Sequence, residues 1–261
     1  MAIQATGYAD GVDAERLLRS VAAVHRRRTE LIPGGRVVDL DGLAVLVSGL
    51  PAPWANFCVV ERVPRDPSAA VEAAEGVLAD VGMPFGIDLP AGRFPDLMRA
   101  IRTHGSRIVE GRPIMTACVG DLPALAPPWE VEIDRVRTDE DLSTIADVDA
   151  EAFETDPRVS RGLYARTVTE ANDVAALLAR LDGEPVGAAF ALRAGGTVAV
   201  FGVGVLPSAR GRGIGGALTC AVARAVGLPD DIAWLFPSEG ARALYERLGF
   251  MVGEPWEVWV S

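Results

Sequence analysis

The segment Pro207–Leu218, PSARGRGIGGAL, constrains the fold more than any other part of the chain. It places four glycines and two arginines between an apolar stretch of strand character, TVAVFGVGV, and an apolar stretch of helical periodicity. Glycines between a strand and a helix let backbone N–H groups turn toward an anion, which then lies at the positive end of the helix dipole. We therefore expect a strand, an anion-binding loop and a helix here.

Two common phosphate-binding loops fit this segment poorly. A Walker loop needs Gly-Lys followed by Ser or Thr, and the chain contains no lysine. Gly211, Gly213 and Gly216 do satisfy the dinucleotide spacing G-x-G-x-x-G. However, LPSAR separates the loop from its strand, and Asp230 and Asp231 precede the next strand, whereas the ribose-binding acid normally follows it. A plain strand-to-helix turn would need only one or two glycines.

A third pattern fits the loop and a second segment downstream. Arg210–Gly215, RGRGIG, resembles the R-x-x-G-x-G acyl-CoA pyrophosphate loop of the GNAT N-acetyltransferases, and VGVLPSA resembles the strand that leads into it. Ser238–Phe250, SEGARALYERLGF, resembles the closing helix of that family with its Leu-Tyr…Leu-Gly-Phe signature. The order of elements expected between Glu130 and Ser261 also agrees with the family. The resemblance covers the C-terminal half of the chain.

The resemblance implies an acyl-CoA-dependent N-acetyltransferase. Such an enzyme transfers an acetyl group from acetyl-CoA to a primary amine, of a small molecule or a protein, by direct attack within a ternary complex. The alternative is a non-catalytic acyl-CoA sensor or interaction module. The residues implied to bind the cofactor are Val203, Gly204, Val205, Arg210, Gly211, Arg212, Gly213, Ile214, Gly215, Gly216 and Ser238.

Catalytic roles are harder to assign. The resemblance implies that Tyr245 protonates the departing CoA thiolate, although Tyr245 also lies on an apolar helical stripe typical of core packing. Ser238 would contact the cofactor or only cap its helix. No general base is assigned. Acidic residues of the first C-terminal helix and its following loop are candidates, but surface solvation explains each of them as well; they are Glu151, Glu154 and Asp156. His25 and His104 are expected to be structural.

The chain divides near its middle at a proline-rich segment, Asp121–Ile133. We expect an N-terminal domain over residues 1–125 and a catalytic domain over 130–261. In the first half, a helix, Gly105 and a strand repeat the order of the closing helix, Gly249 and strand, which aligns Ile101 with Tyr245. The first half contains no counterpart of the RGRGIG loop. It is therefore read as a degenerate GNAT-like domain, with an unrelated α+β cap as the alternative.

The expected fold class is mixed α+β, with a central, mostly antiparallel sheet flanked by helices. Periodicity and turn residues predict the individual elements. Helices are expected at 13–28, 67–81, 94–104, 138–153, 213–226 and 238–249. Strands are expected within 36–49 (two), and at 56–63, 107–119, 130–136, 174–181, 186–193, 197–205, 231–236 and 250–260.

Composition excludes several classes of protein. A content of 49% hydrophobic residues supports a buried core, and a net charge of −11 opposes binding to nucleic acid. Glycine and proline interrupt the uncharged runs, so no membrane span is expected, and the N-terminus lacks the pattern of a secretory signal. Three cysteines, Cys58, Cys118 and Cys220, lie outside any metal-ligand spacing. We expect no metal, a cytoplasmic location, and leave a homodimer open.

Overall fold

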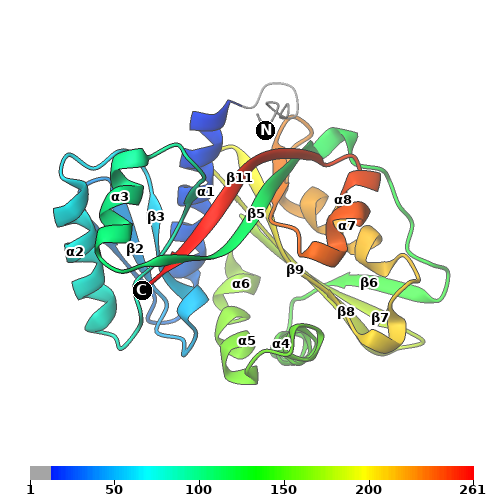
Figure 1. Cartoon of the computed structure of the whole chain (residues 1–261). Helices are drawn as coiled ribbons and strands as arrows, with labels where there is room; N and C mark the ends of the chain where they lie inside the picture. Colours follow the sequence, from blue (N-terminus) through cyan, green and yellow to red (C-terminus); the bar gives the residue numbers. More distant parts are fainter. Residues whose placement is uncertain (1–12) are drawn as a thin grey trace.

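The computed structural model describes residues 13–261, and one sheet of eleven strands runs through this part of the chain (Figure 1). The strand order is β1-β2-β3-β4-β11-β5-β10-β9-β8-β7-β6, and within it only the pairs β3–β4 and β9–β10 are parallel. The expected mixed α+β class with a mostly antiparallel sheet is therefore confirmed. The strands are β1 (Arg36–Asp39), β2 (Leu43–Val47), β3 (Asn56–Val60), β4 (Gly86–Pro90), β5 (Arg107–Cys118), β6 (Val131–Arg135), β7 (Val174–Leu181), β8 (Glu184–Ala194), β9 (Thr197–Val205), β10 (Ile232–Leu235) and β11 (Met251–Val260).

Helices cover both faces of the sheet. The helices are α1 (Ala14–Leu31), α2 (Pro67–Ala79), α3 (Pro95–Thr103), α4 (Asp139–Phe153), α5 (Pro157–Leu163), α6 (Thr167–Glu170), α7 (Ile214–Val226) and α8 (Arg242–Arg247). Alternate residues of β8 belong to different core clusters: Phe190 faces the cluster that contains α1 and α4, and Ala189 faces the cluster that contains α7. This alternation follows from the two-residue period of a strand. The helices α4 and α7 thus lie on opposite faces of the same strands.

The two halves of the chain repeat one order of elements. The first half runs β1, β2, β3, α2, β4, α3, β5, and the second runs β7, β8, β9, α7, β10, α8, β11. In each half the one parallel pair of strands is connected through a helix, α2 or α7. Gly105 and Gly249 follow α3 and α8 with φ of +91° and +92°, a conformation that favours glycine. Ile101 is fully buried, so at the position aligned with Tyr245 the first half has a core residue.

The last strands of the two halves cross over. β11, from the end of the chain, pairs with β4 of the first half, and β5 pairs with β10 of the second half. β5 and β11 also pair with each other from Met251↔Thr116 to Val260↔Arg107, and Figure 1 shows them running together across the middle of the molecule. The boundary near residues 125–130 stays a prediction, and it divides the chain without dividing the sheet.

Most elements expected from the sequence are present, with ends shifted by a few residues. Thr138 caps α4 in a reciprocal capping box with Asp141. The helix expected from Ser238 begins as a 3-10 turn, Glu239–Ala241, before the six residues of α8. Two short helices, α5 and α6, and strand β4 were not predicted. β4, GIDLP, is buried throughout and too short for a visible period.

Membrane spans, metal-binding clusters and the state of the cysteines can be examined in the described residues. Within residues 13–261, no helix is both long and apolar enough to cross a membrane. The same residues contain no group of three or more His, Cys, Asp or Glu side chains placed to hold a metal. Cys58, Cys118 and Cys220 are free thiols. The N-terminal segment for which no secretory signal is expected lies largely in residues 1–12, outside the described part.

Candidate functional site

The strands β9 and β10 separate at one end, and this separation opens the candidate site. They pair only along Thr197–Ala199 and Ile232–Trp234, although β9 continues to Val205. A bulge in β9 lies beside the opening. Between the pairs Phe190↔Phe201 and Ala188↔Gly204 the chain advances two residues on β8 but three on β9, so β9 carries one extra residue. Gly202, in the bulge, has φ +55°. Beyond Ala199 the edge of β9 that faces away from β8 pairs with no other strand within residues 13–261.

The residues predicted on this strand, Val203, Gly204 and Val205, lie along that free edge. The carbonyl of Val205 accepts a hydrogen bond from Arg210 Nε at 2.9 Å, whereas the next residue, Leu206, donates its N–H back to Val186 on β8. Because polar groups alternate sides along a strand, the backbone of Val205 faces the opening. A ligand in the opening can therefore pair with this backbone as an extra strand would.

The predicted loop ends in a helix that has no side-chain cap. Gly211 and Gly213 have φ of +77° and +83°, so the turn depends on glycine. Gly213 is the N-cap of α7, and the first backbone bond of the helix runs from the Ala217 N–H to the Gly213 carbonyl at 3.2 Å. The N–H groups of the three residues between them have no partner inside the helix. They are the predicted Ile214, Gly215 and Gly216, of which Ile214 buries its side chain.

The two predicted arginines of the loop differ. Arg210 folds back, donating to the carbonyls of Val205 and, at 3.4 Å, Ala152. Arg212 is exposed and forms no ion pair with another described residue. A Cβ added to Gly215 or Gly216 would meet the side chain of Leu244 only at ordinary contact distances of 3.6 and 3.5 Å. The protein itself therefore does not require glycine at either of these two positions.

Two predicted residues face the opening from the segment after β9: Ser238, which follows β10, and Tyr245, which lies on α8. Tyr245 is 7% exposed, its ring meets Phe250 edge to face at 5.8 Å, and its hydroxyl has no hydrogen-bond partner among the described residues. Burial raises the pKa of this phenol to about 12. Ser238 precedes the 3-10 turn, but its hydroxyl makes no capping bond. Both residues line one cavity.

That cavity, of about 570 Å³, lies between the two halves of the chain. Its walls come from β9, β10 and α8 on one side, and from α1, β3, β4, β5 and β11 on the other. Val203, Ser238 and Tyr245 are the predicted residues that line it. The predicted loop residues 210–216 lie outside it, at the far end of β9. The structure thus brings the predicted residues together as two groups joined by the free edge of that strand.

A second cavity, of about 390 Å³, adjoins the first and contains a carboxylate that the sequence analysis missed. Asp149 accepts hydrogen bonds from Ser160 Oγ at 2.8 Å and from the Tyr164 hydroxyl at 3.1 Å. Burial raises the pKa of Asp149, and those two hydrogen bonds and the charge of Arg28 oppose this shift. A Cβ on Gly202 would stand 3.2 Å from Asp149 Oδ1, so the carboxylate abuts the bulge of β9.

The acidic residues considered from the sequence lie elsewhere. Glu151 and Glu154 are exposed, and Asp156 caps α5 and pairs with Arg158. The sequence does carry a signal for Asp149, because it lies four residues after Ile145 on the apolar stripe of α4. A carboxylate on a buried stripe is uncommon and indicates either a structural partner or a functional site.

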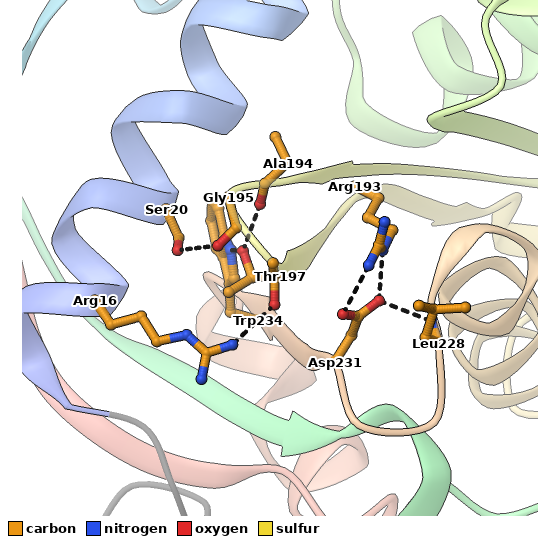
Figure 2. Close-up of polar contacts among 10 residues, drawn as sticks. Arg16, Ser20, Arg193, Ala194, Gly195, Thr197, Leu228, Asp231 and Trp234 are labelled. Atoms are coloured by element: carbon orange, nitrogen blue, oxygen red, sulfur yellow. Dashed lines mark hydrogen bonds and ion pairs between the residues drawn. The ribbon is translucent and has the colours of Figure 1, made fainter.

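Helix α1 of the first half forms the opposite wall of both cavities. Arg16 Nη2 and Ser20 Oγ donate to the carbonyls of Gly196 and Gly195, at 3.3 and 3.1 Å, in the turn between β8 and β9 (Figure 2). The same turn leads into Thr197, whose hydroxyl accepts from Trp234 Nε1 at 3.1 Å. These bonds tie α1 to the two strands whose separation opens the site.

Two charged pairs fix the surroundings of that turn and helix. Arg193, on β8, forms two hydrogen bonds of 2.6 and 3.2 Å with Asp231 just before β10 (Figure 2). Near the other end of α1, Arg27 pairs with Asp173 at 2.6 and 3.2 Å. As a result, His25 and Arg28 of α1 are held in the cavity wall. Neither residue was expected from the sequence to have a role in the site.

Comparison with known proteins agrees with this geometry. The model of the acetyltransferase (GNAT) family matches residues 127–250. The structure resembles a GCN5-related N-acetyltransferase from Kribbella flavida at 27% identity, with a TM-score of 0.77 over 97% of this chain and 96% of that one. Among curated protein sequences, none matches the chain significantly.

More distant solved structures share the fold over nearly the whole chain. A GCN5-related N-acetyltransferase from Sphaerobacter thermophilus has 19% identity and a TM-score of 0.63, covering 94% of this chain and 91% of its own. A tandem GNAT protein from the clavulanic acid biosynthesis pathway has 16% identity and a TM-score of 0.61, covering 98% and 97%. The C-terminal half of the chain, residues 127–250, belongs to the GNAT family of acetyltransferases.

Proposed function

We propose that the protein is an N-acetyltransferase that transfers an acetyl group from acetyl-CoA to a primary amine. The observation that carries this proposal is the free edge of β9, which runs from the uncapped N-terminus of α7 to a cavity that contains Tyr245. An extended ligand with an anionic head and a reactive tail fits such a path. Acetyl-CoA has this form, with its pyrophosphate at one end and its thioester at the other.

The cofactor would lie along this path. Its pyrophosphate accepts hydrogen bonds from the N–H groups of the loop and of the first turn of α7, with Arg212 as a nearby exposed cation. The pantetheine pairs with the free backbone edge at Val203–Val205, and Ser238 faces it from the other side. The thioester then reaches the cavity beside Tyr245.

Besides the correct placement of both reactants, the reaction needs the nitrogen to lose two protons, one before attack and one as the amide forms, and the leaving thiolate to gain one. The amine, freed of its extra proton, attacks the thioester carbonyl carbon; a C–N bond forms, the C–S bond breaks, and the thiolate leaves. The second nitrogen proton restores the phenol that has protonated the thiolate. We assign the proton transfer from the ammonium to Asp149, which lines the smaller cavity, and the protonation of the thiolate to Tyr245, which lines the larger one. A phenol with a pKa of about 12 remains protonated at neutral pH and is available as a donor. Positioning can supply ~7–11 kcal/mol of the barrier.

Calorimetry with acetyl-CoA and CoA, followed by thiol release with a panel of amines, tests the proposal. We expect micromolar acetyl-CoA affinity and turnover with at least one amine. Tyr245→Phe removes the proton donor and keeps the ring that packs on Phe250, so kcat should fall by about 10²-fold while CoA affinity is unchanged.

Each other outcome has a definite meaning. CoA binding without turnover of any amine would indicate a non-catalytic acyl-CoA-binding module. Affinity for NAD in place of CoA would support the dinucleotide reading of the loop, and no affinity for either would contradict an acyl-CoA site altogether.

A further inference from the structure

Arg28 is an unpaired cation in the wall shared by the two cavities. Its guanidinium carbon lies 5.0 Å from the centre of the Phe201 ring and 5.9 Å from that of Trp54, and it forms no ion pair with a described carboxylate. The two preceding arginines of α1, Arg26 and Arg27, both pair with carboxylates. Burial lowers the pKa of Arg28, as expected for a cation removed from water, but arginine stays charged at neutral pH.

The place of Arg28 separates it from the proposed cofactor phosphates. It lies over Phe201, which precedes the bulge of β9, whereas the loop at 210–216 follows the other end of the strand. A strand rises roughly 3.3 Å per residue, so the backbone of Val203–Val205, proposed to pair with the pantetheine, lies between Arg28 and the loop. Arg28 therefore lies at the thioester end of the proposed path, where the acceptor must meet the cofactor.

The residues around Arg28 indicate which other chemical groups an acceptor could carry. Asp149 offers a carboxylate in the smaller cavity, whose other walls are mainly apolar and include Phe153, Leu163 and Phe190. One turn before Arg28, His25 is 6% exposed, and burial lowers its pKa to about 3, so it is neutral. Its Nε2 is buried and has no hydrogen-bond partner in the described part of the chain, and the residue lines the larger cavity. Among the described residues, the shared wall thus offers Arg28 as a cation without an ion pair, a neutral hydrogen-bonding group and apolar surface. The other charged residues of the larger cavity pair with one another, Arg112 with Asp88 and Glu110.

We propose that the acceptor is a small primary amine that also bears a carboxylate and an apolar side chain, as an amino acid does, and that its carboxylate pairs with Arg28. The inference rests on the proposed function, because it assigns the acceptor of the same site. In this arrangement Arg28 binds the anionic end, and the ammonium lies toward Asp149 and the thioester. Arg28 determines specificity and takes no part in proton transfer.

Matched ligands test the proposal without depending on turnover. The probes are the N-acetyl derivatives of phenylalanine, leucine and tryptophan, each compared with its carboxamide, which has the same shape and no charge. Calorimetry is performed on the full chain with CoA present. We expect at least one carboxylate to bind tenfold or more tightly than its amide. Equal binding within all three pairs, or no binding of any carboxylate, would overturn the proposal.

Variants then assign the discrimination to Arg28. Arg28→Met should abolish the preference for carboxylate, and Arg28→Lys, which keeps the charge, should retain part of it. Arg19→Met is the matched control, because Arg19 is on the same helix, exposed and outside both cavities, and it should change nothing. A carboxylate preference that survives in Arg28→Met and Arg28→Lys alike contradicts the assignment.

Thiol release from acetyl-CoA with the free amino acids and their amides is measured separately. Carboxylate-selective binding without any thiol release would refute the proposed acetyl transfer and leave the anion site supported. Thiol release that favours the amides would refute the anion site and leave the proposed function standing.

Discussion

Asp149 is the residue whose ionisation should set the pH dependence of the reaction. Burial raises its pKa, and the Ser160 and Tyr164 hydroxyls and the Arg28 charge partly compensate. A general base acts only when ionised, so activity should rise with pH through this raised pKa. The same shift makes the folded state hold its proton more tightly than the unfolded chain. The stability contribution of Asp149 is therefore complete at low pH and is lost as pH rises through the folded pKa.

Asp149→Asn should lower kcat by about 10²–10⁴-fold and remove the acidic limb of the kcat/KM profile, because the amide accepts hydrogen bonds but no proton. The measurement is thiol release from pH 5 to 9. Asp147→Asn is a suitable control, since Asp147 is exposed on the same helix and pairs with Arg161 on the surface. An Asp149→Asn variant that keeps the full pH profile would assign the base elsewhere, to a water or another group.

At the scale of single elements, helix α1 connects the two halves of the chain, because its side chains bond to residues of the second half. Two of its contacts to the second half lie near its start, and Arg27 pairs with Asp173 near its end, with side chains about one-third exposed. Because His25 and Arg28 are on the same helix, the position of α1 sets the width of both cavities. Loosening the helix should therefore affect binding of the proposed acceptor before it affects the loop at residues 210–216, which α1 does not contact.

A double-mutant cycle on Arg27→Ala and Asp173→Ala tests this link. We expect a coupling free energy of about 0.5–1 kcal/mol, since the pair is partly exposed, with a raised KM for the amine and an unchanged acetyl-CoA affinity. The pair Arg26–Asp39 is the matched control, because both residues belong to the first half. Breaking it should lower stability by a similar amount and leave the KM for the amine unchanged. Equal effects of the two pairs on KM would contradict the role given to α1.

Local sequence patterns predicted the loop at residues 210–216. They did not predict the cavity wall opposite it, because that wall depends on contacts between residues far apart in the sequence. Gly211 and Gly213 are recognisable from sequence because their positive φ requires glycine at a fixed spacing between strand and helix. Arg28 and Asp149 line the same cavity although they lie in different halves of the chain, and no local sequence pattern predicts that they come together. The pairing of β11 with β4 and of β5 with β10 could not be predicted either, because a strand pattern predicts a strand but does not identify the strand with which it pairs.

At the scale of the whole molecule, the crossing of β5 and β11 makes the two halves mutually dependent. Without residues 130–261, β4 and β5 would lose β11 from between them and β5 would also lose β10. Without residues 1–125, β11 would lose both of its partners, and its buried side chains Trp256 and Trp259 would be uncovered. Exposed strand edges and uncovered tryptophans favour aggregation.

We expect the intact chain to unfold in one cooperative transition, followed by calorimetry or circular dichroism, because one sheet crosses both halves. Residues 1–125 and 130–261, produced separately, should be unfolded or aggregated, and refolding them together should restore the native spectrum and acetyl-CoA binding. A cut in the intact chain within the Pro123–Pro128 connection is the control, since it breaks one peptide bond and no strand pairing; it should leave the fold intact. Should either half alone unfold cooperatively as a monomer, the exchanged strands would be dispensable, and the two halves would be independent domains that merely share an edge.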